Sequence, residues 1–123
     1  SAGNNKITIT ERGTCFGYRD LMVDPRSFLI LKKLNYPVFF DVGHSVRKNG
    51  FPSSNIKEGG QKEFGETYAR SAISNFVDGL FIEVHPDPKN AKCDAATQFS
   101  FNEFEKLLTN VKPLWDFVNS KSN

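Results

Sequence analysis

Ionisable side chains follow each of three short apolar segments, and their types suit the binding of an anion or a metal ion. They are Glu11 and Arg12 after the first segment, Asp41 and His44 after the second, and Glu83, His85, Asp87 and Asp94 within and after the third. Glu83 interrupts an apolar run, and a carboxylate buried there would need a partner, because an unpaired buried charge destabilises the fold. Taken together, these residues are more typical of a binding site than of unrelated surface positions.

Two kinds of chemistry fit this group of residues. His44, Glu83 and Asp94 offer one imidazole nitrogen and two carboxylates, a donor set that suits Zn, Fe or Mn. They lie far apart in the sequence, so no local spacing motif supports a metal site. Arg12, with Lys62 in a loop, could hold a phosphate or carboxylate, because a guanidinium pairs with two oxygen atoms at once. The residues therefore predict a site for a small anionic molecule, with or without a divalent metal.

The segments that position these residues alternate between strands and helices. Short runs rich in β-branched or aromatic residues predict strands at Lys6–Thr10, Pro37–Val42 and Gly79–Val84. Helical patterns follow them, beginning at Asp24-Pro25, spanning Gln61–Asn75, and beginning at a capping box, Ser100–Glu103. This order is typical of parallel βαβ units, in which ligands bind at the carboxyl ends of the strands. The fold class is therefore predicted to be α/β.

Three local features add expectations about the helices and loops. Phe64, Tyr68, Ala72 and Ile73 are expected to share the buried face of the second helix. Pro113 is expected to bend or end the third helix. The polar segment 45–60 is expected to be a long irregular loop, a kind that is usually functional or mobile.

Composition narrows the class of protein. The chain has 123 residues, which favours a single domain, and its net charge of +2 does not call for nucleic acid or an anionic membrane as a partner. Its apolar runs are far shorter than the ~20 residues of a membrane span, and its first residues do not form a signal peptide. Two cysteines are too few for a disulfide framework. We therefore expect a soluble, single-domain cytoplasmic protein, whose function must be inferred from its motifs.

Several strings of residues resemble one enzyme family. They are Thr10-Glu-Arg-Gly-Thr-Cys-Phe-Gly-Tyr18, Asp41-Val-Gly-His-Ser-Val46, Phe81-Ile-Glu-Val-His-Pro-Asp-Pro88 and Ala91-Lys-Cys-Asp94. In this order and spacing they resemble 3-deoxy-D-manno-octulosonate-8-phosphate synthase, also named 2-dehydro-3-deoxyphosphooctonate aldolase. The resemblance implies a (β/α)8 TIM barrel of about twice this length. Residues 1–123 would be the C-terminal part of that single domain and would contain its last three βα units.

The resemblance also implies an activity. The family condenses phosphoenolpyruvate with D-arabinose 5-phosphate and water, releasing phosphate, in lipopolysaccharide biosynthesis; the family is cytoplasmic and its members are homo-tetramers. A sister family, 3-deoxy-D-arabino-heptulosonate-7-phosphate synthase, shares several strings but uses erythrose 4-phosphate. The segment after Gly13 and the insertion between Ser45 and Gly59 favour the octulosonate family. As one part of that barrel, the 123-residue piece by itself is expected to be inactive. The remaining alternative is a barrel fragment that has no catalytic role at all.

The family implies roles for individual residues. Arg12 would bind the phosphate of phosphoenolpyruvate, and His44 and Asp94 would be catalytic, with His44 also near the substrate. His44, Glu83 and Asp94 would be three of four metal ligands. The fourth, a Cys in metal-dependent members and an Asn in metal-independent ones, comes from an earlier strand, so the metal requirement stays open.

Two positions depart from the family pattern. Lys62 stands where the family has Arg, so it keeps the positive charge but loses the bidentate geometry expected of a substrate-binding arginine. Arg47 stands where the family usually has Gln.

Overall fold

The structure is a computed structural model that describes residues 3–51 and 57–120. Its central sheet has three strands, β1 (Ile9–Glu11), β4 (Val38–Asp41) and β5 (Gly79–Phe81), in the order β1-β4-β5. Both strand pairs are parallel. The α/β class and the parallel arrangement are therefore confirmed, although each strand is shorter than the apolar run that predicts it.

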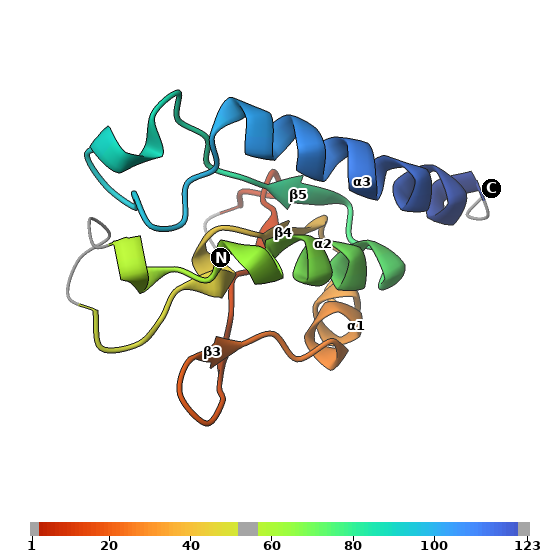
Figure 1. The fold of residues 1–123 in the computed structure, drawn as a ribbon. Coiled ribbons are helices and arrows are strands. Elements are labelled where there is room, and N and C mark those ends of the chain that lie inside the picture. The colour runs from red at the N-terminus through yellow and green to blue at the C-terminus, as the bar shows by residue number, and fades with distance from the viewer. Residues whose placement is uncertain (1–2, 52–56, 121–123) are drawn as a thin grey trace.

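Three helices cover one face of this sheet (Figure 1). They are α1 (Arg26–Lys32), α2 (Gly65–Ser74) and α3 (Phe101–Ser120). The buried ring of Phe40 on β4 meets Phe28 of α1 edge-on, with ring centroids 5.7 Å apart, and Tyr68 of α2 at 6.4 Å. Leu107 and Val111 of α3 belong to the same buried cluster. The hydrophobic core thus lies between the sheet and its helices.

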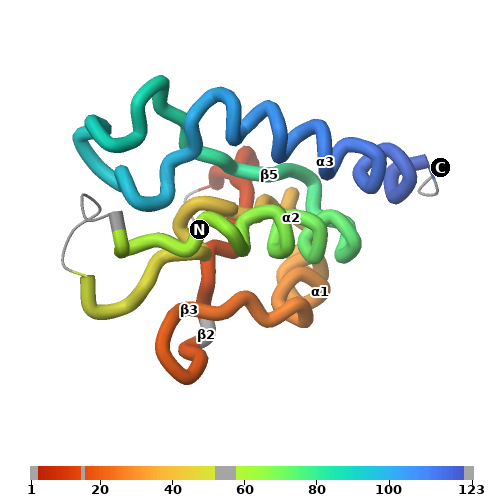
Figure 2. Tube along the Cα trace, in the orientation of Figure 1, coloured from red at the N-terminus to blue at the C-terminus, as the bar shows by residue number. Residues whose placement is uncertain are grey.

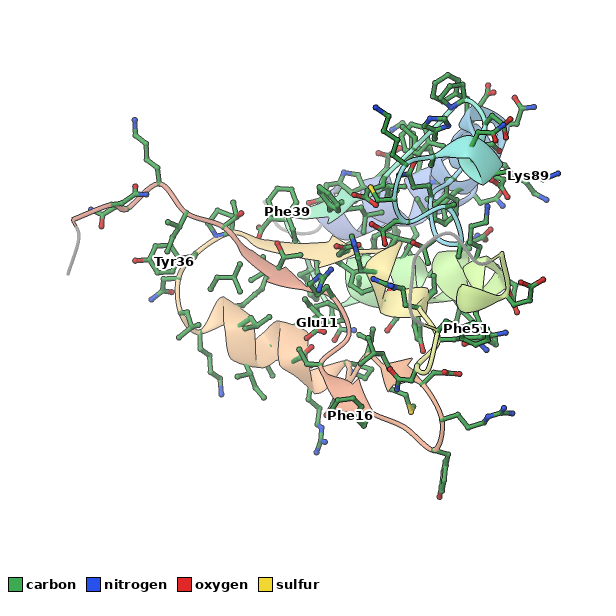
Figure 3. The ribbon with its side chains drawn as sticks, turned by 90° about the vertical axis from the view of Figure 1, so that its left-hand side faces the viewer. Glu11, Phe16, Tyr36, Phe39, Phe51 and Lys89 are labelled. Atoms are coloured by element: carbon green, nitrogen blue, oxygen red, sulfur yellow. The ribbon has the colours of Figure 1, made fainter. Side chains whose placement is uncertain are left out.

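The opposite face of the sheet carries no helix among the described residues. Because side chains alternate along a strand, the register of Thr10 with Phe39 and of Asp41 with Phe81 places all four on this face. Figure 3 shows Phe39 on the side of the sheet away from α1, with Glu11 on the α1 side. Phe81 is 47% exposed. The site residues Arg12, Asp41 and Glu83 belong to this helix-free face.

A hairpin that the sequence did not predict separates β1 from α1. It pairs β2 (Cys15–Phe16) with β3 (Leu21–Met22) in antiparallel fashion. Its turn is closed by the Gly17 N–H, which donates to the Asp20 carbonyl at 2.9 Å. Strands of two residues are too short to leave an alternating pattern in the sequence.

The helix predictions are confirmed in part. The capping box forms as expected: the Ser100 N–H donates to Glu103 Oε2 at 2.7 Å, and the Glu103 N–H donates to Ser100 Oγ at 3.3 Å. α3 continues through Pro113 to Ser120, so the expectation that the proline could end the helix is wrong. Leu114 and Trp115, directly after the proline, still pack against the core and hold the helix together.

The second helix begins later than its apolar pattern suggested. Residues Lys62–Phe64 form a 3-10 turn, η3, and α2 starts only at Gly65. The tighter turn rotates Phe64 away from the core, so its expected burial is wrong and its side chain is 46% exposed. Tyr68, Ala72 and Ile73 pack against or within the core as expected.

The segment 45–60 is closed at its base. After the short helix η1 (His44–Val46), Arg47 forms a β-bridge with Gly60. The Lys48 N–H donates to the Gly59 carbonyl, and the Gln61 N–H donates to the Val46 carbonyl, both at 2.9 Å. The middle of this expected loop, residues 52–56, lies outside the described residues. Two further 3-10 turns are η2 (Lys57–Gly59) and η4 (Pro88–Asn90).

No helix in the described ranges combines the length and apolar character that crossing a membrane requires.

Candidate functional site

The loops that follow β4 and β5 meet at the carboxyl edge of the sheet, on the left of Figure 2. Contact between them is direct, because a Cβ added at Gly43 would lie 3.4 Å from the Thr97 carbonyl oxygen. There the structure brings His44, Glu83 and Asp94 together, with candidate ligand atoms all within 4.8 Å of one another. The expectation that these distant residues share one place is therefore met, whereas their role as metal ligands stays a prediction.

Asp41 fixes the ring of His44. The Asp41 side chain is 6% exposed, and its Oδ2 lies 2.8 Å from His44 Nδ1. Its other oxygen, Oδ1, accepts the His44 backbone N–H at 3.0 Å. Because an ionised carboxylate only accepts, Nδ1 carries the proton and a neutral ring presents the lone pair of Nε2. That Nε2 lies 3.9 Å from Asp94 Oδ2. A carboxylate behind a histidine in this way is typical of metal-binding histidines.

Asp94 is held in an unusual backbone conformation by the loop around it. Its φ of 50° lies in the left-handed region, which Asp tolerates better than most residues. Its carbonyl accepts the N–H groups of Thr97 at 2.9 Å and Gln98 at 2.8 Å, and both of these residues are buried. Gly60 packs against this loop so closely that an added Cβ would lie 2.3 Å from the Ala96 carbonyl oxygen. The segment after Arg47 thus supports the loop that presents Asp94.

Within residues 3–51 and 57–120, the Glu83 and Asp94 carboxylates of this cluster accept no hydrogen bond. Asp94 Oδ1 is buried and accepts none, although Arg47 Nη1 lies 3.4 Å away as an ion-pair partner. We find no ion pair or hydrogen bond from the Glu83 carboxylate to any described side chain. Unsatisfied carboxylate oxygens beside a free imidazole nitrogen fit a divalent cation, since a cation would satisfy all three donors. The residues present therefore fit the metal that the sequence resemblance implies.

Arg12 lines a small basic cavity beside this cluster. The cavity, about 240 Å³, is lined by Arg12, Leu21, His44, Arg47, Lys48, Asn49, Gly50 and Phe51. The Arg12 side chain is 57% exposed, and its Nε lies 3.8 Å from Asp41 Oδ2, too far for a hydrogen bond. Its donors are therefore open to a ligand. Three cationic side chains around a small cavity suit a phosphate or carboxylate group.

Glu11 supports the turn that carries Arg12. Its carboxylate is buried on the α1 side of β1 (Figure 3) and accepts the Gly13 N–H at 2.8 Å. Gly13 has a φ of +88°, which side-chain-bearing residues rarely adopt. In this string Glu11 anchors the turn by a hydrogen bond, Gly13 adopts the positive φ that the turn requires, and Arg12 between them carries the cationic group of the cavity.

Lys62 is not brought together with Arg12 and His44. Its Nζ lies 2.9 Å from Glu103 Oε1 and donates to the Gln98 carbonyl at 3.1 Å. It lines a different cavity, of about 490 Å³, together with Lys89 and Glu103. Figure 3 shows Lys89 well apart from Phe51, which lines the cavity of Arg12. The substrate-binding role of Lys62 stays an untested prediction that this geometry does not favour.

Two residues of the site were not assigned a role from the sequence. Asp41 could have been found from its position, because a carboxylate three residues before a histidine at a strand end can reach the ring. Arg47 offered no such signal. Its approach to Asp94 depends on the pairing of Arg47 with Gly60 and on the path of the loop after β5.

Comparison with known proteins connects this site to one family. The family model described as the DAHP synthetase I family matches residues 1–118. The 2-dehydro-3-deoxyphosphooctonate aldolases of Pelobacter propionicus and Geotalea uraniireducens are 43% and 44% identical over 114 residues, which are 93% of this chain and 41% of each relative. The protein of the same name from Geobacter sp. is 42% identical over 119 residues, 97% of this chain and 43% of the relative. The resemblance drawn from the motifs is therefore confirmed, and the chain spans about two-fifths of the length of these relatives.

Proposed function

The chain belongs to the DAHP synthetase I family, and from this membership we propose that it supplies the C-terminal part of a 3-deoxy-D-manno-octulosonate-8-phosphate synthase. The proposed reaction condenses phosphoenolpyruvate with D-arabinose 5-phosphate and water to give 3-deoxy-D-manno-octulosonate 8-phosphate and phosphate, in lipopolysaccharide biosynthesis. The names of the relatives support the octulosonate enzyme over its heptulosonate sister.

We propose that residues 1–123 form the last three βα units of a (β/α)8 barrel. Two observations support this. The three strands are parallel and adjacent in chain order, as consecutive barrel strands are. All three helices lie on one face, while the other face carries Phe39 and Phe81, as expected of a face that turns toward a barrel interior.

The observation that carries the proposed activity is the position of Arg12 beside the His44–Asp94 pair at the carboxyl edge of the sheet. Arg12 holds the phosphate of phosphoenolpyruvate in the basic cavity, and Arg47 and Lys48 extend the positive charge around it. His44 is oriented by Asp41, and Nε2 is the ring atom that would accept a hydrogen bond or bind a cation. This places a phosphate next to polar groups that can orient an aldehyde or a water molecule.

We propose that His44, Glu83 and Asp94 hold a divalent metal, Zn, Fe or Mn, in the enzyme. When bound, such a cation polarises a carbonyl group and orients the attacking water. The convergence of their candidate ligand atoms within 4.8 Å and the absence of described partners for the Glu83 carboxylate support this assignment. The alternative is a metal-independent site in which the same residues orient water directly.

The test is release of phosphate from phosphoenolpyruvate by the purified synthase that contains residues 1–123 as its C-terminal part, since these residues are proposed to supply only three of the eight βα units. Arabinose 5-phosphate and erythrose 4-phosphate are supplied in parallel reactions, each with and without a chelator. We expect release only with arabinose 5-phosphate, and its loss on His44→Ala substitution. Release with erythrose 4-phosphate alone would indicate the sister activity, and release with neither sugar would overturn catalysis by this chain.

A homo-tetramer in the cytoplasm is proposed on family resemblance. Light scattering coupled to size-exclusion chromatography of the full chain measures the assembly. A mass close to that of one chain at micromolar concentration would contradict the tetramer.

A further inference from the structure

We propose that Arg47 is a built-in counter-cation of Asp94 that weakens divalent-metal binding by the His44–Glu83–Asp94 cluster. The proposal rests on the proposed function only in that these three residues form the metal site. It concerns how tightly a metal binds there and does not depend on which sugar phosphate is the substrate.

Arg47 and His44 approach opposite oxygens of the same carboxylate. Arg47 Nη1 lies 3.4 Å from Asp94 Oδ1, and His44 Nε2 lies 3.9 Å from Oδ2. The Asp94 side chain is 16% exposed and that of Arg47 is 36% exposed, so water screens this charge pair only in part. A cation held between His44 and Asp94 Oδ2 would therefore share the Asp94 carboxylate with the Arg47 guanidinium.

The backbone around Arg47 is tied down on both sides. The Arg47 N–H donates to the His44 carbonyl at 3.3 Å, and Arg47 itself bridges to Gly60. The flanking residues Val46 and Lys48 each hydrogen-bond to the strand-like segment opposite. Because its Cα is anchored in this way, the guanidinium remains within reach of Asp94.

The charge balance of the cluster changes with Arg47. The Asp41 carboxylate contacts His44 Nδ1 and lies 3.8 Å from Arg12 Nε. The two other carboxylates near the imidazole are therefore those of Glu83 and Asp94. Without Arg47 their combined charge of about −2 matches a divalent cation. With Arg47 the cluster carries about −1, and the guanidinium repels any cation placed next to it. Arg47 thus supplies part of the positive charge that a metal would otherwise bring.

The experiment measures binding of Mn²⁺ alone to the metal-stripped full chain by equilibrium dialysis. We expect Arg47→Gln to lower the Kd for Mn²⁺ about tenfold or more, because a like charge is removed from the vicinity of the ion. Arg47→Lys, which keeps the charge, should remain close to the parent. Lys33→Gln is the control: it removes a charge from an exposed residue at the C-terminal end of α1, outside the proposed site, and should change the Kd by less than about threefold.

Opposite results overturn the proposal. With an unaltered circular dichroism spectrum, a raised Kd in Arg47→Gln would mean that Arg47 positions Asp94 as a ligand, and an unchanged Kd would mean that Arg47 does not affect metal binding. Failure of both the parent and Arg47→Gln to bind Mn²⁺ would also overturn it. The phosphate-release assay then decides separately whether the synthase activity stands, because it is run at saturating metal and with a chelator, and release under either condition would support the activity whatever the Kd for Mn²⁺.

Discussion

His44 Nδ1 lies 2.8 Å from Asp41 Oδ2, and both residues come from the same turn at the end of β4. This contact selects one tautomer and one ring orientation, and it leaves Nε2 directed at Asp94. Asp41 also lies on the helix-free face of the sheet, where its charge is near Arg12. A single buried carboxylate therefore connects the proposed metal site to the proposed phosphate site.

Replacing Asp41 by Asn should disturb His44 without removing a ligand. An amide fits the same space but does not match the charge of the carboxylate, and it no longer enforces the proton on Nδ1. We expect Asp41→Asn to weaken Mn²⁺ binding about 10–100-fold. Equilibrium dialysis provides the measurement. Equal affinity in the parent and the variant would show that Asp41 does not orient the ring.

Arg12 should contribute mainly to binding of the anionic substrate. Arg12→Lys retains the positive charge but cannot form the bidentate hydrogen bonds of a guanidinium, so we expect the KM for phosphoenolpyruvate to rise about tenfold. Steady-state kinetics of phosphate release measures this change. Lys89→Gln, which removes a cation from the other cavity, is the control and should leave the KM unchanged. A normal KM in Arg12→Lys would remove Arg12 from the phosphate site.

Gly60 should be intolerant of even a methyl group. A Cβ there would lie 2.3 Å from the Ala96 carbonyl oxygen, in the loop that presents Asp94, so either the loop or the bridge to Arg47 must shift. We expect Gly60→Ala to lower the free energy of unfolding by about 1–3 kcal/mol and to weaken Mn²⁺ binding.

Gly59→Ala is the matched control for this substitution. Its Cβ would meet ordinary van der Waals contacts, the nearest at 3.5 Å from Phe51 Cβ. Urea denaturation and dialysis of both variants test the comparison. Equal stability of the two variants would contradict the tight approach of the loops.

Phe28 should be a major contributor to stability. Its side chain is fully buried and packs edge-on against Phe40. We expect Phe28→Ala to lower the free energy of unfolding by about 3–5 kcal/mol, measured by urea denaturation. Leu29→Ala, at the next position of the same helix and 63% exposed, should cost much less. Similar losses in both variants would argue against the helix–sheet packing described above.

Glu103 should make stability depend on pH in the acidic range. Burial raises the pKa of Glu103, but hydrogen bonds from the Ser100 N–H and Lys62 outweigh it, and the pKa lies below its ordinary value of 4.5. Because the folded pKa is the lower one, this contribution is present above about pH 4.5 and is lost as the pH falls through the folded pKa.

The test is the free energy of unfolding between pH 3 and 7, measured for the parent and Glu103→Gln. The difference between them should shrink toward low pH, and its size should be modest, because Glu103 is about half exposed. Glu105→Gln, exposed on the same helix, serves as the control. A difference that does not vary with pH would contradict the ionic role of Glu103.

Sequence patterns were enough to predict the three parallel strands, the three helices that follow them and the grouping of His44, Glu83 and Asp94, but not the β2–β3 hairpin. Short apolar runs with polar residues at their ends predict parallel strands, and parallel strands bring their carboxyl ends to one edge. This is why His44, Glu83 and Asp94 could be grouped although 50 residues separate the first from the last. Capping of α3 was also predictable, because a capping box involves only neighbouring residues.

Tertiary structure decided the pairings between loops. Lys62 is held by Glu103 and Gln98, which its own segment does not reveal, and Arg47 approaches Asp94 only because residues 47 and 60 pair and the Asp94 loop packs on Gly60. Such contacts depend on where two loops pass each other in space. Local sequence patterns indicate the periods of helices and strands, but they do not indicate which loops contact each other. The charged neighbours of Asp94, Arg47 and His44, are therefore known only from the folded chain.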